Sequence, residues 1–195
     1  MQNKTKINPV EVIRPAGILT AICIIVTLLL AVTNALTVDK IAENAEKAAA
    51  ESRSKVLAAD SYTQLDEAGN VYAAVLENGG YAGVVVVTKA NGYGGAIQVM
   101  TGIKLDGSVS GVNILEMNET PGLGAKAKED KFLSQFKGAS ESDMSVKKDG
   151  GTVDAISGAT ITSRAVTQAV NEALETAKPY LEKLNNQTGG DEAIG

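Results

Sequence analysis

The pattern of hydrophobic and polar positions divides the chain into one uninterrupted apolar segment and a longer mixed segment. Residues 16–36 read AGILTAICIIVTLLLAVTNAL and include no charged residue. A helix of this length spans about 31 Å, close to the thickness of the hydrocarbon core of a bilayer. A cleaved signal peptide is the alternative, but its apolar core is commonly shorter and ends at a small-residue cleavage site. The pattern therefore predicts a transmembrane helix over residues 16–36.

The segment after residue 58 contains runs of β-branched residues separated by turns. Asn-Gly and Asp-Gly occur between these runs, and both dipeptides tolerate the positive φ of tight hairpins. Val84–Val87 is apolar on both faces, which is typical of a central strand. An antiparallel meander is predicted, with strands at 71–77, 81–89, 95–105 and 109–117.

Helical periodicity indicates further elements on either side of the predicted sheet. Residues 37–58 are rich in Ala, Glu and Lys and predict a stalk helix. A short amphipathic helix is expected over 125–136, with Ala127, Phe132, Leu133 and Phe136 facing the core. Apolar residues three and four apart predict a last helix over 162–183, which Pro179 should kink or restart.

These elements predict an α+β fold: a single N-terminal transmembrane helix followed by an antiparallel sheet covered by helices. The expected organisation is a cytoplasmic N-terminus, the membrane helix, the stalk, one folded domain and a flexible tail, at residues 1–15, 16–36, 37–58, 59–184 and 185–195.

Charge and composition narrow the chemistry. The chain has no histidine and one cysteine, which excludes histidine-based catalysis, histidine-ligated metals, iron–sulfur clusters and CxxC redox pairs. We expect no metal site and no catalytic residue. The net charge of −5 argues against a nucleic-acid partner, because binding phosphates requires clustered Lys and Arg.

The distribution of charge predicts how the chain is oriented in a membrane. Lys4, Lys6 and Arg14 precede the apolar segment with only Glu11 opposing them, whereas 15 basic and 22 acidic residues follow it. Positively charged flanks remain in the cytoplasm. We therefore expect an inner-membrane protein with lipid around its single span and the acidic domain on the periplasmic or extracytoplasmic side.

Small and hydroxyl-bearing residues gather just before the predicted last helix. The segment Asp154-Ala155-Ile156-Ser157-Gly158-Ala159-Thr160 allows close approach to the backbone, and the first turn of a helix attracts phosphate. Taken alone, however, these residues favour an ordinary helix cap, with Thr162 or Ser163 as the capping residue.

The same block resembles the flavinylation motif of the FMN-binding domain family, Asp-x-x-Ser/Thr-Gly-Ala-Thr. The matching positions are Asp154, Ser157, Gly158, Ala159 and Thr160. A second block characteristic of the family lies upstream and consists of Glu119, Thr120, Pro121, Gly122, Leu123 and Gly124. The resemblance implies that a phosphoester joins FMN to Thr160, and that the upstream block forms part of the flavin pocket with Leu123 on the ring. It also implies that a separate FAD-dependent FMN transferase attaches the flavin.

Within this family the chain is most similar to the G subunits of Rnf electron-transport complexes. The resemblance implies an electron-carrying subunit, not catalytic alone, of a membrane complex that couples ferredoxin and NAD to ion transport. The alternatives are a C-type subunit of a sodium-translocating NADH:quinone reductase, a membrane-anchored FMN redox sensor, and a flavin-free envelope protein. Three tyrosines are expected in the core or on the sheet rather than against the flavin, namely Tyr72, Tyr81 and Tyr93.

Overall fold

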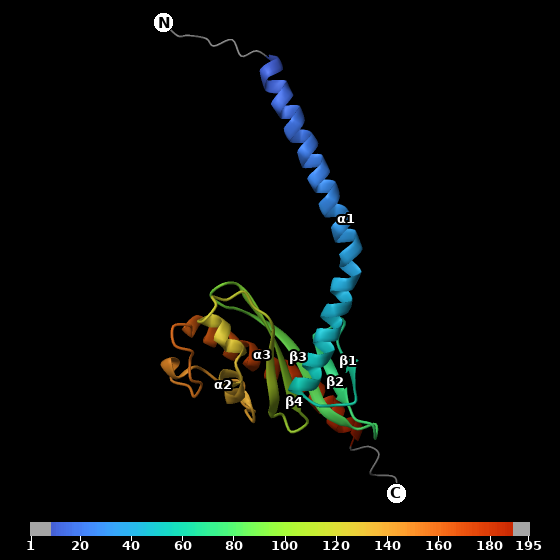
Figure 1. The fold of residues 1–195 in the computed structure, drawn as a ribbon. Coiled ribbons are helices and arrows are strands. Elements are labelled where there is room, and N and C mark those ends of the chain that lie inside the picture. Colours follow the sequence, from blue (N-terminus) through green and yellow to red (C-terminus); the bar gives the residue numbers. More distant parts are fainter. Residues whose placement is uncertain (1–8, 189–195) are drawn as a thin grey trace. The chain divides into compact units, whose positions relative to one another are not determined.

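The computed structural model describes residues 9–188 and begins with one long helix, α1 (Pro9–Val56) (Figure 1). Its stretch Pro15–Val38 has a mean hydropathy of 2.6 and is long enough to cross a membrane. The hydroxyls of Thr20 and Thr33 donate hydrogen bonds to carbonyls four residues earlier, at 2.9 and 2.8 Å. These bonds give the threonine hydroxyls a hydrogen-bond partner, which lipid tails cannot provide. Of the helices in the described part of the chain, α1 alone has this length and hydropathy.

The chain divides into two compact units, residues 1–48 and residues 49–195. The second unit therefore includes the last turns of α1, where Ser52, Arg53 and Val56 are buried. Val56 and the following Leu57 form a small core with Val85 and Met100 of the sheet. Burying each of these side chains contributes about 1.5–3 kcal/mol. The segment predicted as a stalk thus ends within the packed core of the domain.

The sheet is an antiparallel meander, as predicted, and has five strands in the order β1-β2-β3-β4-β5. Its strands are β1 (Ser61–Gln64), β2 (Val71–Val75), β3 (Tyr81–Asn91), β4 (Ala96–Lys104) and β5 (Val109–Glu116). The central strand is β3, and its Val84, Val85 and Val86 are fully buried. The pattern did not predict β1, because this edge strand is mostly exposed and lacks alternating apolar residues.

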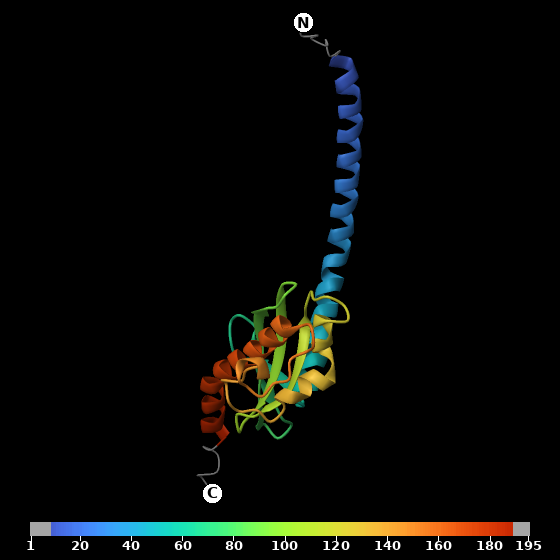
Figure 2. The same ribbon diagram turned by 90° about the vertical axis from the view of Figure 1, so that its left-hand side faces the viewer.

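Helix α3 (Thr160–Thr188) packs on the other face of the sheet, mainly against β3 and also against β4 (Figure 2). Its buried apolar face includes Val166, Ala169, Val170, Ala173, Leu174, Ala177 and Leu181. Pro179 was predicted to kink or restart the helix; the restart is wrong, because α3 continues through this residue. Pro179 is exposed, so water can reach the carbonyl that loses its amide partner. Residues 185–188, predicted as tail, continue α3, and residues 189–195 lie outside the described residues.

Short helical segments connect β5 to α3. They are η1 (Gly124–Lys128), α2 (Asp130–Leu133), η2 (Ser134–Phe136) and η3 (Lys147–Asp149). The prediction of one helix over 125–136 is wrong, because Glu129 adopts an extended conformation with φ −74° and ψ 140°. The apolar residues predicted for its core face are nevertheless buried. Phe132 and Phe136 pack edge to face with ring centroids 5.6 Å apart.

Candidate functional site

The first turn of α3 has no side-chain cap. Its first intrahelical bond runs from the Ser163 N–H to the Ala159 carbonyl at 3.0 Å, which makes Ala159 the N-cap residue. Alanine has no side-chain acceptor, and nothing among the described residues accepts a hydrogen bond from the backbone N–H of Thr160, Ile161 or Thr162. These amides and the positive end of the helix dipole form a favourable environment for an anion.

The two residues expected to cap α3 have other partners, so that prediction is wrong. The Thr162 hydroxyl donates to Glu119 Oε2 at 3.1 Å. The Ser163 hydroxyl donates to the Ala159 carbonyl and accepts from the Ile156 N–H, both at 2.9 Å. Ser163 thereby stabilises the loop before the helix and leaves the first-turn amides unpaired.

The loop that leads into α3 is held at both ends. At its start, the side-chain amide of Gln135 accepts from the Asp154 N–H at 2.7 Å and donates to the Asp154 carbonyl at 3.3 Å. At its end, Gly158 adopts a left-handed conformation with φ +77°, where a side chain would be strained. A Cβ at Gly158 would also lie 3.1 Å from Leu123 Cδ2. The loop and the Leu123 segment are therefore in close contact.

Glu119 connects three separate parts of the chain. Its Oε1 accepts hydrogen bonds from the backbone N–H groups of Tyr93 and Gly94 at 2.8 and 3.2 Å, and its Oε2 accepts from Thr162. A Cβ at Gly124 would lie 2.5 Å from the same carboxylate. Glycine at 124 therefore makes room for Glu119 to join the β3–β4 turn to α3.

A cavity of about 560 Å³ lies beside the first turn of α3, within the size range of small-molecule sites. Tyr93, Leu123 and Ile161, at its rim, are 74%, 45% and 49% exposed. Outside α1, no other large hydrophobic residue in the described part of the chain is exposed to this extent. The remaining lining residues are Glu119, Thr120, Gly124, Lys148, Gly158, Ala159, Thr160 and Thr162.

Basic residues of η3 and α3 lie close to Thr160. The Lys148 ammonium donates to the Thr160 hydroxyl at 3.1 Å. Arg164 forms a bidentate pair with Asp149, with both N–O distances at 2.6 Å. This hydrogen-bonded pairing lowers the pKa of Asp149 below its ordinary value and raises that of Arg164. The pair joins η3 to the first turns of α3.

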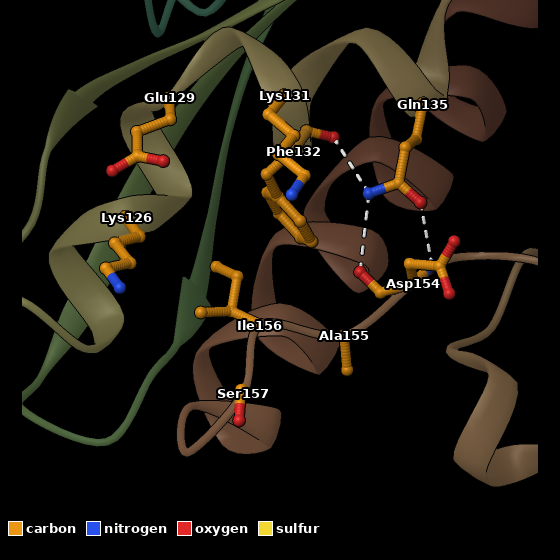
Figure 3. A pocket seen from close by; sticks show the side chains of 9 residues that line it. All are labelled: Lys126, Glu129, Lys131, Phe132, Gln135, Asp154, Ala155, Ile156 and Ser157. Carbon is orange, nitrogen blue, oxygen red and sulfur yellow. Dashed lines mark hydrogen bonds between the residues drawn. The ribbon is translucent and has the colours of Figure 1, made fainter.

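Residues 154–157 of the same loop line part of a second cavity, of about 620 Å³ (Figure 3). Residues of η1, α2 and η2 line it together with residues 154–157. Its lining residues are Lys126, Glu129, Lys131, Phe132, Gln135, Asp154, Ala155, Ile156 and Ser157. The Asp154 carboxylate forms an ion pair with Lys147 at 2.8 Å and is largely exposed.

The two predicted blocks meet in space, but not all of their residues line one cavity. Glu119, Thr120, Leu123, Gly124, Gly158, Ala159 and Thr160 surround the first cavity, whereas Asp154 and Ser157 line the second. Pro121 and Gly122 are exposed and line neither. Sequence reasoning missed Lys148, Ile161 and Gln135, and it expected Tyr93 in the core or on the sheet. No local motif marks these residues, because chain folding brings them to the loop.

The arrangement suits a phosphorylated aromatic group. Unpaired amides and one ammonium meet at a helix N-terminus, and an exposed apolar rim lies beside them. A family model described as FMN-binding domain matches residues 92–175. This part of the folded unit therefore matches the FMN-binding domain family. A second model, described as RnfG N-terminal region, matches residues 2–56.

Two relatives define the family more narrowly, and one solved structure is also similar. The G subunit of the ion-translocating oxidoreductase complex of Yersinia pestis is 37% identical over 181 residues, covering 80% of this chain and 87% of the relative. The G subunit of the proton-translocating ferredoxin:NAD(+) oxidoreductase complex of Clostridium ljungdahlii is 40% identical over 125 residues, covering 63% and 67%. The crystal structure of Shewanella oneidensis NqrC has 27% identity, a TM-score of 0.49 and 60% coverage of each chain. This chain belongs to the family of G subunits of ion-translocating oxidoreductase complexes.

Proposed function

We propose that FMN is esterified to Thr160, with its phosphate at the first turn of α3. The observation that carries this proposal is the uncapped helix start beside a partly exposed threonine. Thr162, the nearest other threonine, is only 1% exposed and donates its hydroxyl to Glu119. A transferase could reach Thr160 without unfolding the helix, whereas Thr162 is inaccessible.

The flavin ring lies in the cavity bordered by Tyr93, Leu123 and Ile161. These side chains offer an apolar surface to the ring. Their unusual exposure in the flavin-free chain is explained if the bound ring covers part of this surface. Glu119 fixes the position of Tyr93 through the backbone, so the cavity is largely formed before flavin binds. Thr120 and Gly124 line the same cavity.

Attachment of the flavin depends on a separate enzyme. Lys148 donates a hydrogen bond to the Thr160 hydroxyl, so this exposed ammonium does not act as its base. In the transfer, the Thr160 oxygen forms a bond to the FMN phosphorus of FAD, the pyrophosphate bond breaks and AMP leaves. The hydroxyl proton passes to a base of the FAD-dependent FMN transferase. Asp154, Ser157 and the exposed Pro121 and Gly122 either are recognised by the transferase or shape the loops around Thr160.

The chain acts as an electron-carrying subunit of a membrane-bound, ion-translocating ferredoxin:NAD oxidoreductase complex. The name of the Clostridium ljungdahlii relative supports this activity over the quinone-reductase alternative. Bound flavin supplies the ability to accept and release electrons, and the protein supplies its position and electrostatic surroundings. In this proposal the apolar part of α1 lies in lipid and the domain lies on the extracytoplasmic side, which the excess of basic residues before the span supports.

Intact-mass measurement of the full chain, co-expressed with an FMN transferase, tests the linkage. The wild-type chain should gain the mass of one FMN less one water and fluoresce on a denaturing gel. Thr160→Ala should lose the label completely while destabilising the domain by no more than about 1 kcal/mol, because Thr160 is partly exposed. Thr162→Ala is the matched control and should keep the label. An unlabelled wild-type chain would refute the proposal, and a labelled Thr160→Ala chain would place the ester elsewhere.

A further inference from the structure

Lys148 differs from two neighbouring basic residues, Lys147 and Arg164, in forming no ion pair with a carboxylate. Lys147 pairs with Asp154 and Arg164 pairs with Asp149, but Lys148 forms no ion pair with any residue that the structure describes. Its ammonium lies 3.1 Å from the Thr160 hydroxyl instead. The side chain thus brings to the proposed attachment point a positive charge that forms no ion pair, although Asp149 contributes to its electrostatic surroundings.

The backbone that carries Lys148 is well fixed. The Lys147 N–H donates to the Val153 carbonyl at 2.8 Å, and the Asp149 N–H donates to the Val146 carbonyl at the same distance. The bidentate pair between Asp149 and Arg164 then holds η3 against α3. The direction of Lys148 toward Thr160 therefore follows from the fold as well as from its flexible side chain.

We propose that Lys148 is the phosphate-binding residue of the site, donating from its ammonium to a non-bridging oxygen of the phosphoester on Thr160. This inference rests on the proposed function. An FMN phosphate esterified to threonine is a phosphodiester, which retains one negative charge on its non-bridging oxygens. Lys148 supplies one positive charge beside these oxygens. The unpaired amides of the first turn of α3 supply the remaining hydrogen bonds.

Lysine acetylation tests the contact without measuring electron transfer. The full chain in detergent micelles is treated with sulfo-NHS acetate, with and without prior labelling by the transferase, and each lysine is followed by peptide mass spectrometry. If the phosphate holds the Lys148 ammonium, Lys148 should react with the reagent roughly fivefold more slowly in the labelled chain. A factor of this size corresponds to the roughly 1 kcal/mol that an exposed ion pair contributes. Lys183, about 34 Å along α3 from Thr160, is the internal control and should react equally in both samples.

Substitution provides a second readout. Lys148→Gln should slow labelling roughly fivefold under matched transferase and FAD, and Lys148→Arg should restore much of the rate, because charge and donors are retained. Lys183→Gln removes the same charge from the far end of α3 and should label at the wild-type rate. Melting of the unlabelled variants checks that each is folded, as expected for an exposed residue of η3.

The outcomes separate the two proposals. A wild-type chain that gains no FMN mass overturns the proposed function, and the role of Lys148 with it. A labelled wild-type chain in which Lys148 acetylates at an unchanged rate overturns the role of Lys148 alone. Equal labelling rates for Lys148→Gln and Lys183→Gln have the same meaning.

Discussion

Two cavities of similar size share the loop before α3, and they differ in how their polar groups are satisfied. The cavity of about 560 Å³ contains unpaired helix amides, a lysine hydrogen-bonded to Thr160 and an exposed apolar rim. Beside the cavity of about 620 Å³, Asp154 is already paired with Lys147, and Gln135 satisfies the loop backbone. The larger cavity has two lysines of its own, Lys126 and Lys131, but its lining does not include the uncapped first turn of α3 or a large exposed hydrophobic residue. The uncapped helix start and the exposed apolar rim, rather than volume, distinguish the first cavity.

Removing Glu119 should have the largest effect on this difference. Glu119→Ala leaves the Tyr93 and Gly94 amides and the Thr162 hydroxyl without their acceptor, which should reduce the free energy of unfolding by about 1–3 kcal/mol. Glu129→Ala, at the other cavity, is the matched control and should change it by less than about 0.5 kcal/mol. Denaturant unfolding of the detergent-solubilised chain measures both. Equal stability of the two variants would show that Glu119 does not organise the first cavity.

Removing Tyr93 should alter the flavin environment more than the stability. Tyr93→Ala deletes one of three apolar neighbours proposed for the ring, so iodide should quench the fluorescence of the labelled chain roughly twofold more efficiently. The unfolding free energy should change by less than about 0.5 kcal/mol, because the side chain is 74% exposed. Lys131→Ala, at the rim of the second cavity, should leave quenching unchanged. The reverse order would place the ring in the second cavity.

The smallest effect should come from the Asp149–Arg164 pair, and only in acid. Arg164 lowers the pKa of Asp149 below its ordinary value near 4, so the folded state favours the ionised carboxylate. Its contribution to stability is present above that ordinary value and disappears as pH falls through the lowered pKa. The difference in melting temperature between wild type and Asp149→Asn should be constant from pH 5 to 8 and shrink below about pH 4. A difference that changes near neutral pH would contradict this account.

Local patterns predicted the sheet well because its signals are local. Asn-Gly and Asp-Gly lie at or next to tight turns, and the valines of β3 are buried on both faces. The short edge strand β1 escaped prediction because its residues are mostly exposed. The break at Glu129 and the continuity of α3 through Pro179 depend on surroundings that periodicity does not reveal.

The candidate site was only partly predictable for a related reason. Two short blocks and their resemblance to a family identified Thr160 and the Glu119 segment. The contacts that organise them join distant positions: Glu119 with Thr162, Gln135 with Asp154, and Lys148 with Thr160. Even the helix start was misplaced by two residues, because Ala159 gives no capping signal. These pairings exist only once η3, the β3–β4 turn and α3 have come together.

The burial of Val56 has a practical consequence for anyone who wishes to isolate the domain. Gly102 and Gly111 face each other across β4 and β5, and a Cβ on either would crowd the Val56 backbone. A truncated fragment that begins at residue 59 lacks Val56 and Leu57, so the space above Gly102 and Gly111 would be empty. Val85 and Met100 would then be uncovered, and such an exposed apolar surface favours aggregation. A fragment beginning at Ala49 would keep its own cover and remain soluble, so the cleavage point between anchor and domain lies within the long helix rather than after it.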